Sequence, residues 1–172
     1  SFAGCRVPKD NVVGQVGKGF QVTVSGIANV RYSLSAACTG IVQSCLDASV
    51  KYSQERRQFA KAIGGFQLVQ ELIADMAISA EASRMLYLRV GYLKDKGLPL
   101  ERETSIAKIF STEAALRASA NGMKIHGAYG YCDEFPVERH FRDIMAPTIF
   151  GGTNEIHRLF IGRNLTGPDA YR

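Results

Sequence analysis

The chain has 172 residues, of which 46% are hydrophobic and 22% are charged, and these proportions are ordinary for a globular domain with an apolar core. Its net charge of +5 is spread along the sequence without a basic block interleaved with aromatic residues, which argues against a nucleic-acid partner. No apolar run approaches the roughly 20 residues that a membrane-spanning helix needs. No hydrophobic leader is visible, and the four cysteines lack zinc-ligand or CxxC spacing, so we expect a reducing, cytoplasmic setting and no metal site.

The first residues differ in character from the rest of the chain. The segment Val7–Gly14 combines β-branched residues with turn residues, which is typical of a strand followed by a turn, and Gly17 and Gly19 interrupt it before a helix begins. A lone strand has no partner here. We therefore expect residues 1–19 to be the end of an upstream β-domain or a linker, and residues 20–172 to form a separate domain.

From residue 20 onward, apolar and small residues recur every three or four positions, which is typical of helices that bury one face. One stripe comprises Ile27, Val30, Leu34, Ala37, Ile41, Ser44 and Ala48. A second stripe comprises Phe66, Val69, Ile73, Met76, Ala80, Ser83, Tyr87 and Val90. Gly64 and Gly65 separate the two helices, and Cys38 and Cys45, spaced seven residues apart, are expected to be small core residues on one helix face.

Three further helices are predicted from their boundary residues. One begins after Pro99 and ends at Lys124, and a short one begins at Pro136 and ends at Arg142. The last begins at the N-cap residue Thr153 and ends near Arg163. Brief loops with glycine join the helices. The sequence therefore predicts an all-α fold, an up-and-down bundle of the four-helix type preceded by a strand-like tail. A free-standing helical adaptor would show the same periodicity.

Three separated segments carry residues suited to nucleotide binding. The segment 55–60, Glu-Arg-Arg-Gln-Phe-Ala, combines a guanidinium that can pair with a diphosphate and an aromatic ring that can pack on a base. The segment 124–131, Lys-Ile-His-Gly-Ala-Tyr-Gly-Tyr, has glycines whose N–H groups can bind phosphate oxygens. The segment 149–158, Ile-Phe-Gly-Gly-Thr-Asn-Glu-Ile-His-Arg, is a loop that opens a capped helix, and the unpaired N–H groups there favour an anion or an acceptor. Each segment alone is also typical of ordinary loops and helix ends.

Together, in their order and spacing, these segments resemble the C-terminal domain of acyl-CoA dehydrogenases. The resemblance covers residues 7 to about 165. It implies a fragment that lacks the N-terminal helical domain and the β-domain, and a parent flavoprotein oxidoreductase that binds FAD between the subunits of a homodimer or homotetramer. It further implies an acyl-CoA or acyl-carrier thioester as substrate and an electron-transfer flavoprotein as oxidant. The location would be the cytoplasm, or the mitochondrial matrix in a eukaryote.

The resemblance also assigns residues to the site. Those expected to contact FAD are Arg56, Phe59, Gln67, Lys124, His126, Gly127, Gly130, Thr153 and Glu155. Arg56 would pair with the pyrophosphate, and Phe59 would pack on the adenine. The loop glycines Gly127 and Gly130 would supply exposed backbone N–H groups. Arg31 and Gly152 are expected on the substrate side, although Ala28 replaces the aspartate that usually accompanies the arginine.

The catalytic base of the family is missing from both of its usual positions. Most members carry a Glu directly before the Gly-Thr pair, where this chain has Gly151, and a few carry it before the arginine of the first helix, where this chain has Val30. Neither residue can accept an α-proton, so the catalytic residue is not assigned. Of the nearby carboxylates, Glu155 lies on the wrong side of the helix cap and Glu134 lies in a turn that looks structural.

Acyl thioester oxidation with hydride transfer to flavin is therefore the leading function, with two alternatives beside it. One is a divergent flavoenzyme of the desulfinase, oxidase or monooxygenase type, in which no Glu removes an α-proton. The other is a non-catalytic paralogue that binds FAD. We further expect the isolated fragment to be inactive and to hold FAD only weakly.

Overall fold

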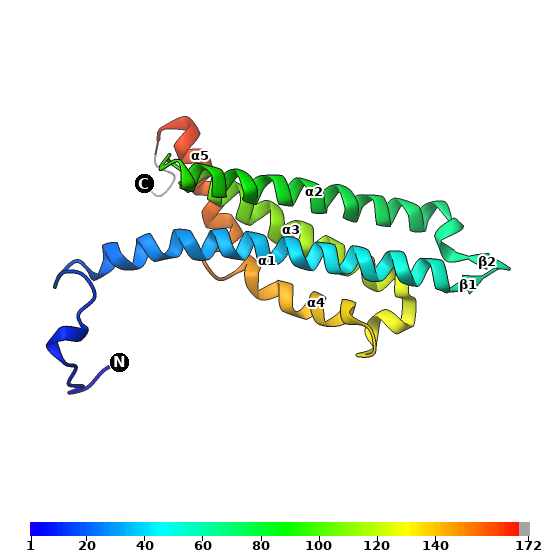
Figure 1. Cartoon of the computed structure of the whole chain (residues 1–172), viewed down its shortest axis with the longest axis horizontal. Coiled ribbons are helices and arrows are strands. Elements are labelled where there is room, and N and C mark those ends of the chain that lie inside the picture. The colour runs from blue at the N-terminus through cyan, green and yellow to red at the C-terminus, as the bar shows by residue number, and fades with distance from the viewer. Residues whose placement is uncertain (169–172) are drawn as a thin grey trace.

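A computed structural model describes residues 1–168 of the protein as an elongated bundle of helices (Figure 1). Three long helices come first: α1 (Gly19–Glu55), α2 (Gln67–Asp95) and α3 (Glu101–His126). Two shorter helices follow: α4 (Pro136–Met145) and α5 (Asn154–Thr166). Helix α3 contacts each of the other four and is the centre of the bundle. The predicted all-α bundle is confirmed, while residues 169–172 of the predicted second domain lie outside the described part.

The stripe expected on α1 is confirmed only in part, because Leu34 and Ile41 pack against the core but the fully buried residues lie beside the stripe. The residues of α1 that are buried are Ser35, Cys38, Thr39, Val42, Cys45, Ser49 and Ser53. Val30, a member of the predicted stripe, is 49% exposed. Small side chains let α1 approach α3 closely, and the larger residues flank this line of contact. Cys38 and Cys45 are buried as predicted, and burial raises the pKa of these thiols to about 11 and about 12.

The other helices begin and end close to the predicted residues. Helix α2 buries Met76, Ala80, Ser83 and Val90, all of them members of its predicted stripe. Helices α3, α4 and α5 each run two or three residues beyond their expected ends. Among residues 1–168, no helix combines the length and the apolar character that crossing a bilayer requires.

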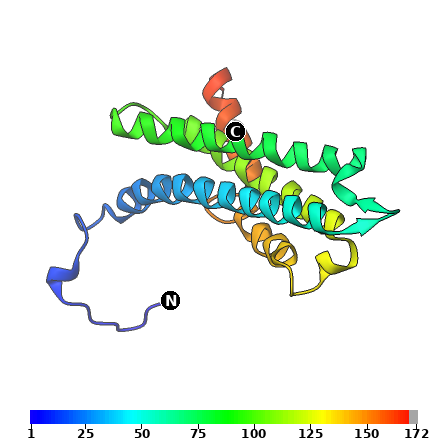
Figure 2. The same ribbon diagram turned by 45° about the vertical axis from the view of Figure 1, so that its right-hand side comes forward.

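The strand expected at Val7–Gly14 does not form. The tail that precedes α1 contains a single 3-10 turn, η1 (Lys9–Asn11), and its side chains are exposed. A strand is stable only when it is paired with a neighbour, and residues 1–18 run away from the bundle, at the end opposite the hairpin (Figures 1 and 2).

A small hairpin that we did not predict joins α1 to α2. Its strands, β1 (Arg57–Gln58) and β2 (Lys61–Ala62), pair antiparallel at the tip of the bundle (Figure 1). The two turn residues between them, Phe59 and Ala60, have φ angles of 52° and 64°. Turns that need positive φ at both positions usually carry glycine or asparagine. The hairpin therefore contains local backbone strain.

Candidate functional site

The residues predicted to form the site fall into two groups that lie far apart along the bundle (Figures 1 and 2). One group surrounds the hairpin, where α1 ends at Arg56. The other lies beside the N-terminal half of α1, where Arg31 reaches the segment 148–153, which we call the α5 loop. At 1.5 Å per residue, Arg31 and Arg56 are separated by roughly 38 Å along the helix axis.

At the hairpin, the end of α1 and the end of α3 enclose a cavity of about 250 Å³, which we call the hairpin-end cavity. Residues of two predicted motifs line it, among them Arg56, Gln58, Gly127 and Tyr129. The guanidinium carbon of Arg56 lies 6.0 Å from the ring centroid of Tyr129, at the outer limit of a cation–π contact. An exposed guanidinium beside a glycine turn is a suitable arrangement for a diphosphate.

The two glycines of the second motif have different roles. Gly127 ends α3 with a φ of 62°, is exposed, and begins the 3-10 turn η3 (Gly127–Tyr131). Gly130 is buried, and a Cβ atom added to it would lie 2.5 Å from the carbonyl oxygen of Met123. The expectation that Gly130 presents an exposed N–H is therefore not met. Glycine is needed there because two backbone segments approach each other closely.

His126 is a core residue and not an open loop residue. Its side chain is 3% exposed, its Nδ1 donates to the carbonyl oxygen of Gly122 at 2.8 Å, and its ring stacks on Tyr52 at 4.3 Å. Burial lowers the pKa of His126 more than the Gly122 hydrogen bond raises it, which favours the neutral ring. Its Nε2 is buried without a partner among the described residues. His126 thus forms the floor of the hairpin-end cavity.

Three other predicted FAD contacts do not line this cavity. Phe59 is 86% exposed at the tip of the hairpin, where its ring forms a T-shaped pair with Phe66 at 6.1 Å between centroids. Gln67 and Lys124 are exposed on α2 and α3. Within one chain, the structure therefore brings Arg56 together with Gly127 but leaves these three side chains pointing outward.

The α5 loop is built on a pair of glycines followed by a helix cap. Gly151 and Gly152 have φ angles of 70° and 96°, a region that favours glycine. Thr153 is the N-cap of α5, as predicted, and its Oγ1 accepts a hydrogen bond from the backbone N–H of Ile156 at 3.3 Å. At Gly151 and Gly152 the loop therefore presents backbone groups without side chains.

Side chains that lie beneath the α5 loop hold its carbonyl groups. The carbonyl oxygen of Gly151 accepts from Arg31 Nε at 2.9 Å and from His157 Nε2 at 3.2 Å. The Ser105 hydroxyl donates to His157 Nδ1 at 3.0 Å. Burial, and then the charge of Arg31, lower the pKa of His157 to about 4, so the ring is neutral and its Nε2 carries the proton. Burial also lowers the pKa of Arg31.

The ammonium of Lys108 is a second group that holds the α5 loop, and the sequence did not predict it. This side chain is fully buried in α3, and its Nζ donates to the carbonyl oxygen of Gly152 and to Asn154 Oδ1, both at 2.8 Å. The available signal was a lone lysine on a helix face that otherwise carries alanine, serine and threonine. His157 was missed for a similar reason, because a histidine one turn into a helix shows no partner in sequence.

The comparisons with known proteins agree with this geometry. The family model described as acyl-CoA dehydrogenase, C-terminal domain, matches residues 17–166. The chain belongs to the acyl-CoA dehydrogenase family. The acryloyl-CoA reductase (NADH) of Anaerotignum propionicum is 39% identical over 164 residues, which are 95% of this chain and 42% of that protein.

Solved structures superpose closely on this chain. Butyryl-CoA dehydrogenase from Megasphaera elsdenii matches with a TM-score of 0.89 and 35% identity, over 92% of this chain and 42% of that one. The structure described as PigA with FAD and proline matches with a TM-score of 0.90 and 28% identity, over 95% of this chain and 43% of that one. The chain thus spans less than half the length of these relatives.

Within this family member, the two carboxylates considered in the sequence analysis are poor substitutes for the absent base. Glu155 is exposed, and hydrogen bonds from its own backbone N–H and from Thr153 lower the pKa of its carboxyl, which makes it a weaker base. Glu134 lies far away, in a cavity beside the hairpin that Lys51 and Glu55 also line. Neither carboxylate meets the Gly151 backbone.

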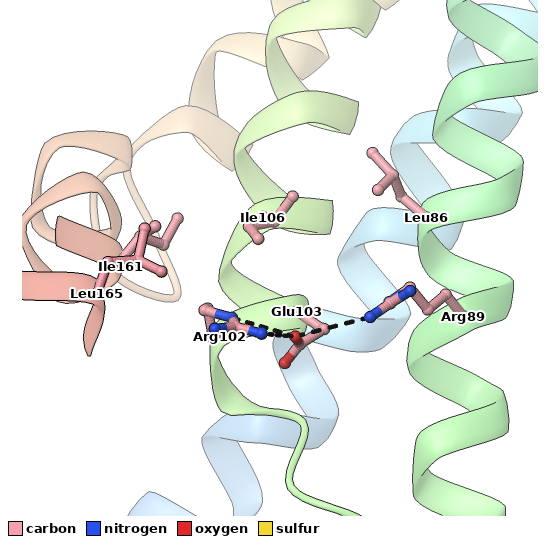
Figure 3. Close-up of a pocket in the computed structure, with 7 residues that line it drawn as sticks. All are labelled: Leu86, Arg89, Arg102, Glu103, Ile106, Ile161 and Leu165. Carbon is pink, nitrogen blue, oxygen red and sulfur yellow. Dashed lines mark hydrogen bonds and ion pairs between the residues drawn. The ribbon is translucent and has the colours of Figure 1, made fainter.

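A further cavity, of about 500 Å³, lies between α2, α3 and α5 (Figure 3). Four apolar side chains and three charged ones line it, and Glu103 lies between Arg102 and Arg89, at 2.7 Å and 4.0 Å. Burial by itself would raise the pKa of Glu103, but the hydrogen bond from Arg102 and the two positive charges outweigh it and lower the pKa. No residue predicted to form the site lines this cavity.

Proposed function

We propose that the protein carrying this chain is an FAD-dependent enzyme that acts on an acyl thioester, with this chain contributing to two flavin sites. The observation that carries the proposal is the separation of roughly 38 Å between Arg31 and Arg56, which one FAD molecule does not span. The hairpin-end cavity suits the diphosphate and adenosine part of one FAD. The α5 loop suits the reacting end of another. Each FAD then lies between two subunits, in a homodimer or homotetramer.

Bound FAD would supply hydride acceptance, and the residues of this chain would bind and orient. At the hairpin end, Arg56 would neutralise the diphosphate, and the exposed turn at Gly127 would approach it closely. In the α5 loop, the N–H groups of Gly151 and Gly152 donate to no acceptor among residues 1–168. They are available to a polar group of the flavin or the thioester, and Thr153 offers a hydroxyl beside them.

The absence of a base at Gly151 favours a divergent reaction on the same scaffold as the second candidate. A Cβ atom added at Gly151 would meet nothing closer than Arg31 Cγ and Leu34 Cδ2, each at 4.0 Å. That space can hold a substituent of the substrate. It supports oxidase, monooxygenase or desulfinase chemistry, in which no glutamate at this position removes an α-proton. A non-catalytic paralogue would also retain the flavin contacts.

The deciding experiment is an anaerobic titration of the native protein, purified with its flavin, against a panel of acyl-CoA thioesters and one acyl-carrier thioester. We expect FAD absorbance, and its bleaching by one class of thioester, with an electron-transfer flavoprotein restoring the oxidised spectrum. A bound flavin that every thioester leaves oxidised would favour the divergent or non-catalytic function. A native protein without flavin would overturn the proposal.

We place the protein in the cytoplasm, or in the mitochondrial matrix of a eukaryote.

A further inference from the structure

Lys108 is the largest side chain that the fold buries completely, and none of the roles proposed above uses its charge. A charged ammonium in a protein interior is strongly unfavourable unless other groups compensate it. Among residues 1–168, no carboxylate lies within ion-pair distance of its Nζ. The close partners of the ammonium are therefore neutral oxygen atoms.

Three oxygens surround this nitrogen. Lys108 Nζ lies 2.8 Å from the carbonyl oxygen of Gly152, 2.8 Å from Asn154 Oδ1 and 3.5 Å from the carbonyl oxygen of Thr148. A neutral amine has two hydrogens and would turn its lone pair toward one of these acceptors. An ammonium has three hydrogens and no lone pair. The set of oxygens selects the ammonium form, so Lys108 is not the missing proton acceptor.

The oxygens come from both sides of Gly151. Thr148 precedes it in the α5 loop, and Gly152 and Asn154 follow it, so one ammonium ties the two ends of the turn together. Asn154 extends the attachment into the core, because its Nδ2 donates to Thr112 Oγ1 at 3.1 Å. The loop is fastened to α3 through a buried polar network.

This attachment to α3 matters because Gly151 and Gly152 do not restrict their own backbone angles. With no Cβ atom, Gly151 and Gly152 have more freedom of φ and ψ than any other residues would have. The orientation of their peptide groups decides where their N–H groups point. Arg31 and His157 hold the first carbonyl and Lys108 holds the second.

We propose that Lys108 is a positioning residue whose ammonium fixes the Gly151–Gly152 turn against α3. It thereby sets where the N–H groups of the α5 loop and the Thr153 hydroxyl meet bound ligands. The identity of those ligands, FAD and an acyl thioester, rests on the function proposed above. The fastening of the loop by Lys108 concerns this chain alone and is tested separately.

The first test uses the 172-residue chain without any substitution. Lysine-selective ¹H–¹⁵N spectra should detect the NH₃⁺ group of Lys108, exchanging slowly with water and coupled across its hydrogen bond to the ¹³C carbonyl of Gly152. A Lys108 signal that exchanges as fast as those of exposed lysines, without this coupling, would overturn the proposal even if every variant failed to fold.

The second test compares Lys108→Met with Met76→Ala, a control in the core of α2 that lowers stability without touching the α5 loop. In Lys108→Met, we expect the protected amides of Phe150 and His157 to exchange at least tenfold faster relative to the amides of α1, and the Gly152 carbonyl resonance to shift. In the control, all amides should accelerate together. Equal loop and core effects in both variants would show that Lys108 is a structural residue only.

The same variants in the native protein link the loop to its ligands. We expect Lys108→Met to weaken FAD binding about tenfold and to shift the absorption maximum of the bound flavin, with Met76→Ala leaving both unchanged. Wild-type protein that binds no FAD would overturn the proposed function and leave the loop measurements valid. Wild-type protein that binds FAD, with a Lys108→Met loop unchanged in exchange and in FAD affinity, would overturn the positioning role alone.

Discussion

The two ends of the proposed site differ in how their charges are held. At the hairpin end, the guanidinium of Arg56 is exposed and lines an open cavity. At the α5 loop, the ammonium of Lys108 is buried, Arg31 is half-buried, and both donate to backbone carbonyl groups. An exposed charge can still pair with a ligand of opposite charge. Buried charges are already satisfied, so they shape the loop and leave its N–H groups for the ligand.

This contrast predicts that substitutions beneath the α5 loop act mainly on folding, and Asn154→Ala should have the largest effect. The change removes one of the short contacts to the Lys108 ammonium and the hydrogen bond that Thr112 Oγ1 accepts from Asn154. We expect the free energy of unfolding to fall by about 3 kcal/mol in urea titrations. Asn164→Ala, at an exposed position of the same helix, should change it by less than about 0.5 kcal/mol. Equal effects of the two substitutions would contradict the buried network.

The same network should make the protein less stable in acid through His157. The pKa of this ring is about 4 in the folded chain against 6.5 ordinarily, so between these values the unfolded chain binds more protons. Its contribution to stability is complete above pH 6.5 and is lost as the pH falls toward 4. From pH 8 to pH 5 we expect a loss of about 2 kcal/mol that is absent in His157→Gln. His126 and His140, whose pKa values burial also lowers, remain in both proteins. Parallel pH profiles would contradict this assignment.

The sequence predicts features that depend on neighbouring residues, and it misses features that depend on residues far apart in the chain. The helices and the Thr153 cap depend on neighbours within a few residues, and the structure confirms them. The contact of Lys108 with Asn154 joins residues 46 positions apart, which no local pattern encodes. The core face of α1 was predicted in part. Leu34 and Ile41 of the predicted stripe pack against the core. Val30 is exposed instead, and small residues outside the stripe, such as Ser35, are buried.

The residues of the three motifs show the same difference between local and long-range features. The sequence located the segments that carry Arg56 and Gly151, because their residue types are informative on their own. It could not tell that His126 stacks in the core or that Gly130 is needed for close backbone packing, since both properties depend on the path of η3 against α1 and α3. It also left the catalytic base unassigned, and among the described residues the hydrogen bonds to Gly151 come from Arg31 and His157 and not from a carboxyl group.

At the hairpin end, where the charge is exposed, a substitution should weaken ligand binding and have little effect on the stability of the fold. Arg56→Met should weaken FAD binding to the native protein about tenfold, because a charged hydrogen-bonding group is worth about 1.5 kcal/mol or more. Unfolding of the ligand-free chain should be unchanged within about 0.5 kcal/mol. Arg57→Met is the matched control, since the side chain of Arg57 makes only a 3.4 Å contact to the carbonyl oxygen of Ala60. Equal losses of FAD affinity in both variants would indicate a general charge effect.

The smallest predicted effect concerns the strain in the hairpin turn. Ala60 has a φ of 64°, a conformation that costs a residue with a Cβ atom about 1 kcal/mol and costs glycine almost nothing. Ala60→Gly should therefore stabilise the chain by up to about 1 kcal/mol, although part of the gain is offset by the greater freedom of glycine in the unfolded chain. Ala62→Gly, two residues further on and with a φ of −62°, relieves no strain and should destabilise by about 0.5–1 kcal/mol.

The opposite signs of the two changes, measured in parallel urea titrations, separate turn strain from any general effect of glycine. A loss of stability in both variants would show that the turn is unstrained. If Ala60→Gly stabilises the chain and also weakens FAD binding, the strain serves to hold Phe59 at the tip for its ligand.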